Sequence, residues 1–102
     1  MITHLETENF NELISSDLTL VDFHATWCGP CKMLTPVLES IASLDNINFK
    51  IVKIDIDQHE NLAREYGIMS VPTMIAFKDG KAVKAFQGFM PKEEILNQME
   101  GL

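Results

Sequence analysis

The sequence predicts one α/β domain, with a central mixed sheet of about five strands flanked by helices on both faces. Three observations predict this class: strand-like apolar runs alternate with helix-like segments, an Asp-Gly turn separates the last two runs, and the chain has 102 residues. Strands separated by helices pair in parallel through right-handed crossovers, whereas a tight turn joins antiparallel neighbours. A chain of this length has room for one core, so we expect residues 1–102 to form a single domain.

The N-terminal part of the chain predicts a short first strand, a short helix and then a buried strand. Thr7 is of a residue type that caps helices, and the segment after it can turn Phe10, Leu13 and Ile14 inward. Residues 18–25 (LTLVDFHA) form a short, mostly apolar run, which is typical of a buried strand.

A long helix, a strand and a short helix are expected next. Residues 30–44 repeat apolar side chains at helical spacing, which predicts a helix with one buried face. Residues 48–54 alternate and are rich in residues that favour strands. Residues 58–66 fit a short helix that ends at Gly67, because glycine readily adopts the left-handed conformation that follows many helices.

The C-terminal part predicts a hairpin and a last helix. Residues 73–77 and 82–87 flank the turn sequence Lys-Asp-Gly-Lys, and Asp-Gly between two apolar runs is a strong hairpin signal. Pro91 suits the first turn of a helix, where the acidic Glu93 and Glu94 are also favourable. The buried stripe of this helix is expected to consist of Ile95, Leu96 and Met99.

The charge and hydropathy patterns exclude several classes of partner. The net charge is -7, from 15 acidic residues against 8 Lys and Arg, so neither nucleic acid nor an anionic membrane is expected as a primary partner. The first residues contain no basic segment and no long apolar run, so no signal peptide is expected. No window approaches the roughly 20 apolar residues of a membrane-spanning helix. We therefore expect a cytoplasmic monomer.

The sequence Trp27-Cys28-Gly29-Pro30-Cys31 lies where the first long strand turns into the long helix. Unpaired backbone N–H groups at a helix N-terminus favour negative charge, so the pKa of Cys28 should be lowered and its thiolate fraction raised. Cys31 lies one turn further on the same face, at about the 5.5 Å Cα separation that a disulfide prefers. Because thiolates attack disulfides, the motif predicts thiol–disulfide exchange, with Cys28 as the attacking thiol and Cys31 as the resolving thiol.

Two other interpretations of the cysteine pair are weaker. Zinc needs four ligands, and the remaining nitrogen donors, His4, His24 and His59, show no paired spacing. A purely structural disulfide across so short a loop would constrain the unfolded chain little. The sequence therefore predicts no metal site, and the two cysteines are expected to be redox-active.

Asp22 interrupts the apolar strand that precedes the dithiol. An aspartate usually faces water, but Val21 and Phe23 are apolar, and a carboxyl in such surroundings has a raised pKa. Asp22 could then take a proton from Cys31 through a water molecule. Lys53 in the next strand is either solvent-facing or, if the two strands are neighbours, able to pair with Asp22.

Three further residues each have a plain and a functional interpretation. The Val71–Pro72 bond is either an ordinary trans bond or a cis bond that shapes the chain, and the sequence does not decide between them. Trp27, the only tryptophan, either packs in the core or lies exposed beside the thiol and touches a substrate. Gly88 is either a turn glycine or a point where another backbone approaches closely.

Taken together, these motifs resemble the thioredoxin family over essentially the whole chain. The resemblance is carried by Val21-Asp22-Phe23, the run WCGPCK from Trp27 to Lys32, Lys53 with Asp55-Ile56-Asp57, Tyr66-Gly67-Ile68, Val71-Pro72-Thr73, Phe77-Lys78-Asp79-Gly80 and Gly88. The Gly-Pro pair between the cysteines is similar to the reducing members of the superfamily, not to its oxidant or isomerase branches.

The resemblance implies a thioredoxin fold and a protein-disulfide reductase that cycles between a dithiol and a Cys28–Cys31 disulfide, with no bound cofactor. It implies that Asp22 and Lys53 tune proton transfer and that Pro72 is a cis proline beside the disulfide. It also implies that an extended substrate pairs with the Val71 backbone. The substrate would dock on an apolar patch made of Trp27, Gly29, Pro30, Ile56, Val71 and Gly88. The implied partners are a thioredoxin reductase, which passes on electrons from NADPH, and target proteins that contain disulfides.

Two residues depart from the family pattern, and one rival function remains open. His24 stands where the family commonly has a large aromatic residue, on the same strand face as Asp22, and is expected to be a partly exposed polar substitute. Its imidazole could also shift the pKa of Asp22 or Cys28. Gln87 is more polar than a docking patch requires. The rival function is a thioredoxin-fold binding subunit of a larger assembly in which the thiols are incidental.

Overall fold

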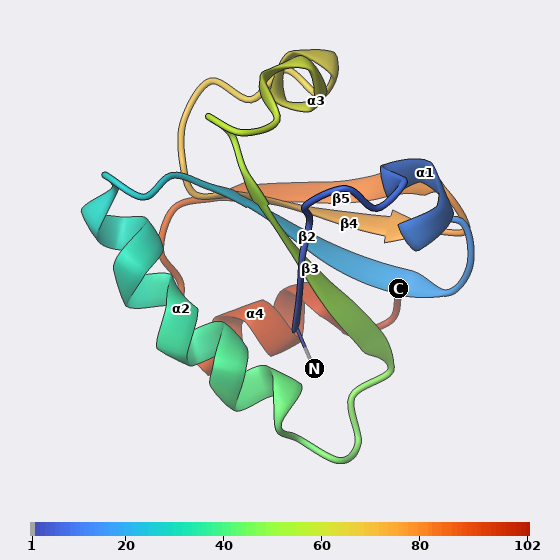
Figure 1. The fold of residues 1–102 in the computed structure, drawn as a ribbon. Coiled ribbons are helices and arrows are strands. Elements are labelled where there is room, and N and C mark those ends of the chain that lie inside the picture. The colour runs from blue at the N-terminus through green and yellow to red at the C-terminus, as the bar shows by residue number, and fades with distance from the viewer. Residues whose placement is uncertain (1) are drawn as a thin grey trace.

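The computed structural model describes residues 2–102, which fold into one central sheet covered by helices (Figure 1). The sheet has five strands in the order β1-β3-β2-β4-β5. The elements in chain order are β1 (Ile2–His4), α1 (Phe10–Leu13), β2 (Leu18–His24), α2 (Gly29–Ala42), β3 (Phe49–Asp55), α3 (Glu60–Glu65), β4 (Thr73–Lys78), β5 (Lys81–Gln87) and α4 (Lys92–Met99).

The sheet is mixed, as the sequence predicts. β3 pairs in parallel with both β1 and β2, whereas β4 pairs antiparallel with β2 and β5. The β4–β5 hairpin turns through Asp79 and Gly80, both with positive φ (50° and 87°). Two successive residues with positive φ are the requirement of the tight hairpin turn that Asp-Gly favours, so the hairpin prediction is confirmed.

Two apolar layers lie on opposite faces of the sheet, because successive side chains of a strand point to opposite sides. On the face covered by α2 and α4 (Figure 1), Leu20 packs with Leu38 and Ile95. On the other face, Phe23 packs with Phe10 and with the partly buried residues that flank α3. The expected α/β class with helices on both faces is confirmed.

The N-terminal helix differs from the prediction in its cap. Asn9, not Thr7, is the N-cap of α1, and its side-chain oxygen accepts a hydrogen bond of 3.2 Å from the backbone N–H of Glu12. The prediction of Thr7 was therefore wrong. An Asn followed three residues later by Glu is itself a helix-start signal, and this signal points to the correct residue.

The other three helices have bounds that differ slightly from the prediction, and α2 spans Gly29–Ala42 where residues 30–44 were predicted. α3 begins at Glu60, after His59 as its N-cap, and is shorter than the predicted residues 58–66. Pro91 is the N-cap of α4 and not a residue of its first turn. In α4, Ile95 and Met99 are buried as expected, and Leu96 is partly buried against the same core.

Candidate active site

The two cysteines lie at the start of α2, immediately beyond the end of β2. Cys28 is the N-cap of this helix, and its Sγ accepts a hydrogen bond of 3.1 Å from the backbone N–H of Cys31. The two sulfurs form a disulfide, with the Cα atoms 5.2 Å apart. Pro30 occupies the first turn, where a missing N–H breaks no helical hydrogen bond. Backbone N–H groups and the helix dipole thus favour negative charge at the Cys28 sulfur.

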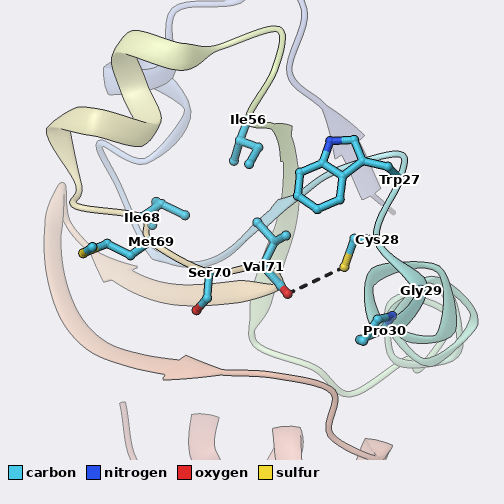
Figure 2. A pocket seen from close by; sticks show the side chains of 9 residues that line it. All are labelled: Trp27, Cys28, Gly29, Pro30, Ile56, Ile68, Met69, Ser70 and Val71. Atoms are coloured by element: carbon cyan, nitrogen blue, oxygen red, sulfur yellow. Dashed lines mark hydrogen bonds between the residues drawn. The ribbon is translucent and has the colours of Figure 1, made fainter.

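A groove of about 480 Å³ opens beside Cys28 (Figure 2). Trp27 is 67% exposed, so it is not a core residue, and its indole N–H donates to Asp57 Oδ2 at 2.8 Å. In Figure 2 the Cys28 sulfur lies between the Trp27 ring and the carbonyl oxygen of Val71, and the Ile56 side chain lies further away on the other side of Val71. The residues that line the groove are Trp27, Cys28, Gly29, Pro30, Ile56, Ile68, Met69, Ser70 and Val71.

The groove contains five of the six residues predicted for the docking patch, and Gly88 is not among its lining residues. Gly88 has φ 87°, and its N–H donates to the carbonyl oxygen of Pro72 at 2.8 Å. Sequence reasoning missed three residues that line the groove: Ile68, Met69 and Ser70. Their signal in the sequence is their position directly before the Val71–Pro72 pair.

The Val71–Pro72 peptide bond is cis. Of the two alternatives that the sequence left open, the structure therefore selects the one that the family resemblance implied. The carbonyl oxygen of Val71 lies 3.6 Å from Cys28 Sγ and faces the groove (Figure 2). A backbone acceptor is thus placed directly beside the Cys28 sulfur.

Asp22 is fully buried in β2, on the face that carries α2. Neither carboxylate oxygen has a hydrogen-bond partner among residues 2–102. Burial raises the pKa of Asp22 from 3.8 to about 7, and the positive charge of Lys53 opposes this rise. The prediction of a buried carboxyl with a raised pKa is confirmed, and its physical cause is desolvation.

Lys53 lies beside Asp22 in the sheet but does not pair with it. The register of β2 and β3 places the two residues side by side, and Lys53 is almost fully buried. Its Nζ donates to Thr35 Oγ1 at 3.0 Å, and within residues 2–102 no ion pair or hydrogen bond joins it to Asp22. Of the two alternatives for Lys53, a solvent-facing side chain is wrong because the residue is buried. The other holds in part: the positive charge of Lys53 lowers the pKa of Asp22, but its hydrogen bond goes to the Thr35 hydroxyl. Sequence reasoning missed Thr35.

His24 is partly buried at the end of β2, as expected for a polar substitute. Burial lowers the pKa of His24, and the nearby positive charge of Lys53 lowers it further. Among residues 2–102, the only charge that shifts the pKa of Asp22 is that of Lys53. The alternative that His24 shifts the pKa of Asp22 is therefore not supported.

The sequence model of the thioredoxin family matches residues 1–101 of this chain. The chain belongs to the thioredoxin family. A thioredoxin of Staphylococcus saprophyticus is 44% identical over 99 residues, which are 97% of this chain and 95% of that protein. A thioredoxin of Chlamydia caviae is 47% identical over 96 residues, which are 94% of this chain and 93% of that protein.

Solved thioredoxin structures share the fold. A mutant thioredoxin from Halobacterium salinarum superposes with a TM-score of 0.88 at 34% identity, covering 97% of this chain and 88% of that chain. Thioredoxins are disulfide oxidoreductases, and the Cys28–Cys31 disulfide at the start of α2 supplies the redox group. This chain is accordingly a thiol–disulfide oxidoreductase of the thioredoxin type.

Among residues 2–102, no three or more His, Cys, Asp or Glu side chains gather in a way that could hold a metal ion. None of the helices in the same range is long and apolar enough to span a bilayer.

Proposed function

We propose that this thioredoxin reduces disulfides in target proteins, with Cys28 as the nucleophile and Cys31 as the resolving thiol. The observation that carries the assignment is the asymmetry of the two sulfurs. Cys28 lines the groove and accepts a hydrogen bond from a backbone N–H of the first helical turn, whereas Cys31 does not line the groove. The sulfur that a target can reach is therefore also the one whose thiolate the helix stabilises.

The reaction consists of two exchanges. The Cys28 thiolate attacks one sulfur of the target disulfide, forming a mixed disulfide, and the other target sulfur leaves as a thiolate that takes up a proton. Cys31 then loses its proton to Asp22 through a water molecule, and its thiolate attacks Cys28 Sγ. The bond between Cys28 and the target breaks, which releases the second target thiol and leaves the Cys28–Cys31 disulfide.

The docking patch is proposed to consist of Trp27, Gly29, Pro30, Ile56, Val71 and Gly88. The groove beside Cys28 supports this assignment, because five of these residues line it. An extended target segment would pair its backbone with Val71, whose carbonyl oxygen faces the groove. Pro72 would set the direction of that backbone, and Lys53 would adjust the charge around Asp22.

Regeneration needs two electrons and two protons for each disulfide. We propose that NADPH supplies the electrons through a thioredoxin reductase, that no cofactor stays bound to this chain, and that the protein works as a monomer in the cytoplasm. The family assignment supports a reductase as partner, and the acidic net charge of -7 disfavours nucleic acid and anionic membranes.

The experiment compares two matched serine variants with the wild type. The wild type is expected to reduce a model disulfide protein with NADPH and a thioredoxin reductase. Cys31→Ser should accumulate a mixed disulfide through Cys28, because the second exchange is blocked, and mass spectrometry should find one target chain attached. Cys28→Ser should form no adduct.

Three results would contradict the proposal. One is turnover by Cys28→Ser, the second is an adduct formed at Cys31, and the third is no turnover by a wild type with an intact dithiol. Full support of the cellular role by the Cys28→Ser, Cys31→Ser double variant would favour the binding-subunit alternative.

A further inference from the structure

Thr35 connects the buried lysine to the helix that carries the dithiol. Its hydroxyl donates to the carbonyl oxygen of Cys31 at 3.3 Å, one helical turn earlier, and accepts from Lys53 Nζ at 3.0 Å. A threonine in a helix commonly bonds the carbonyl four residues before it, which fixes the direction of its oxygen. The ammonium of Lys53 is therefore directed toward α2 and Cys31.

Across the β2–β3 pair, the residue directly beside Lys53 on the same sheet face is Asp22. The two residues are opposite each other in the parallel β2–β3 register, and side chains at such positions share a face. Both are buried, and both oxygens of Asp22 lack a partner among residues 2–102. An unpaired buried carboxyl beside a buried ammonium is a costly arrangement, so a specific contact must hold the two groups apart.

We propose that Thr35 is a positioning residue whose hydroxyl holds the Lys53 ammonium against α2, out of contact with the carboxyl of Asp22. The consequence rests on the proposed function, in which Asp22 takes the proton of Cys31. A carboxylate paired with an ammonium would be a weaker base. Thr35 thus keeps Asp22 able to accept a proton near neutral pH.

The strands on either side of Asp22 are β3 and β4, and among residues 2–102 only the charge of Lys53 shifts its pKa. On the opposite side β4 contributes Met74, which carries no charge. The charges of Lys53, Asp55 and His4 act on the pKa of His24, so this pKa also depends on where the Lys53 ammonium lies. The groups concerned are His24 on β2, Lys53 and Asp55 on β3, His4 on β1, and Cys31 on α2.

Thr35 acts on the side of Cys31 that faces away from the target groove. A separate cavity of about 260 Å³ is lined by Cys31, Thr35, Lys53 and His24, together with three neighbours. None of the residues that line the target groove lines this cavity. A change at Thr35 should therefore alter proton transfer without altering target binding, so kcat should change while KM does not.

The test measures the pKa of Asp22 by NMR of its labelled side-chain carboxyl in the oxidised protein. Thr35→Val removes the hydroxyl and keeps the shape, so Lys53 should move to Asp22 and lower its pKa by at least about one pH unit. Thr35→Ser keeps the hydroxyl and should retain the wild-type value. Thr35→Ala serves as a second hydroxyl-free variant that suits a helix.

Lys53→Met provides the matched background. In Lys53→Met the further change Thr35→Val should leave the pKa of Asp22 unmoved, because no ammonium remains to be released. An unchanged pKa in Thr35→Val and Thr35→Ala would overturn the proposal, and so would an equal fall in the Lys53→Met background. The titration needs no turnover, so failure of the disulfide-reductase assay would count against the proposed function alone.

Discussion

The burial of Asp22 makes folding stability depend on pH in a direction opposite to that of most carboxyls. In the folded protein the pKa of Asp22 is raised to about 7, whereas in the unfolded chain it is near the ordinary 3.8. Between these values the folded state holds a proton that the unfolded state has lost. By linkage, the contribution of Asp22 to the free energy of unfolding falls as the pH rises through this window.

The magnitude follows from the width of that window. A difference of about 3 pH units, at about 1.4 kcal/mol for each, gives a loss of about 4 kcal/mol between pH 4 and pH 8. Asp22→Asn removes the ionisation and keeps the shape. At pH 4 the variant and the wild type should be similarly stable, because an amide and a protonated carboxyl are both neutral. Above pH 8 the variant should be more stable by about 4 kcal/mol.

Urea unfolding of the oxidised proteins between pH 4 and pH 9 measures this difference. Asp45→Asn is the matched control, because Asp45 is exposed, and its stability curve should follow that of the wild type. The free energies of unfolding of Asp22→Asn and the wild type could instead change in parallel over the whole pH range. Ionising Asp22 would then cost no free energy in the folded protein. The assignment of its raised pKa to desolvation would then be wrong.

Three further predictions concern the same region. The rate of the Cys31 resolving step should rise as the pH increases through about 7, where Asp22 becomes ionised, and stopped-flow measurement should find this rise absent in Asp22→Asn. Trp27→Ala should lower kcat/KM for a protein disulfide about tenfold with little loss of stability, because this exposed side chain walls the groove. Gly88→Ala should destabilise the fold by about 1–2 kcal/mol in urea titration, because the backbone φ of 87° at this position disfavours a residue with a Cβ. The added Cβ itself would meet no atom within 4 Å, and equal stability of the variant and the wild type would contradict the prediction.

The fold and the reactive pair could be predicted because their signals are local. Hydrophobic spacing marks the strands and helices, Asp-Gly marks the hairpin, and the position of Cys28 before Pro30 marks a helix start. The burial of Asp22 was also predictable, because its neighbours Val21 and Phe23 are apolar. Each of these signals lies within a few residues of the feature that it predicts.

The partner of Lys53 could not be predicted, because it depends on how α2 lies across the sheet. Asp22 and Lys53 come from different strands, and the register that sets them side by side is a tertiary property. Thr35 is a half-buried residue in the middle of a helix, and no local pattern says which strand residue its hydroxyl meets. Met69 lines the groove through the path of a loop, which periodicity does not describe.

Alkylation of the reduced protein tests the central claim most directly, namely that the N-terminus of α2 holds the Cys28 sulfur as a reactive thiolate. At pH 7, Cys28 in the folded protein should react with iodoacetamide at least about tenfold faster than in the urea-unfolded chain, and Cys31 should stay unmodified. Equal rates in the folded and unfolded chains, or modification of Cys31 first, would contradict the account.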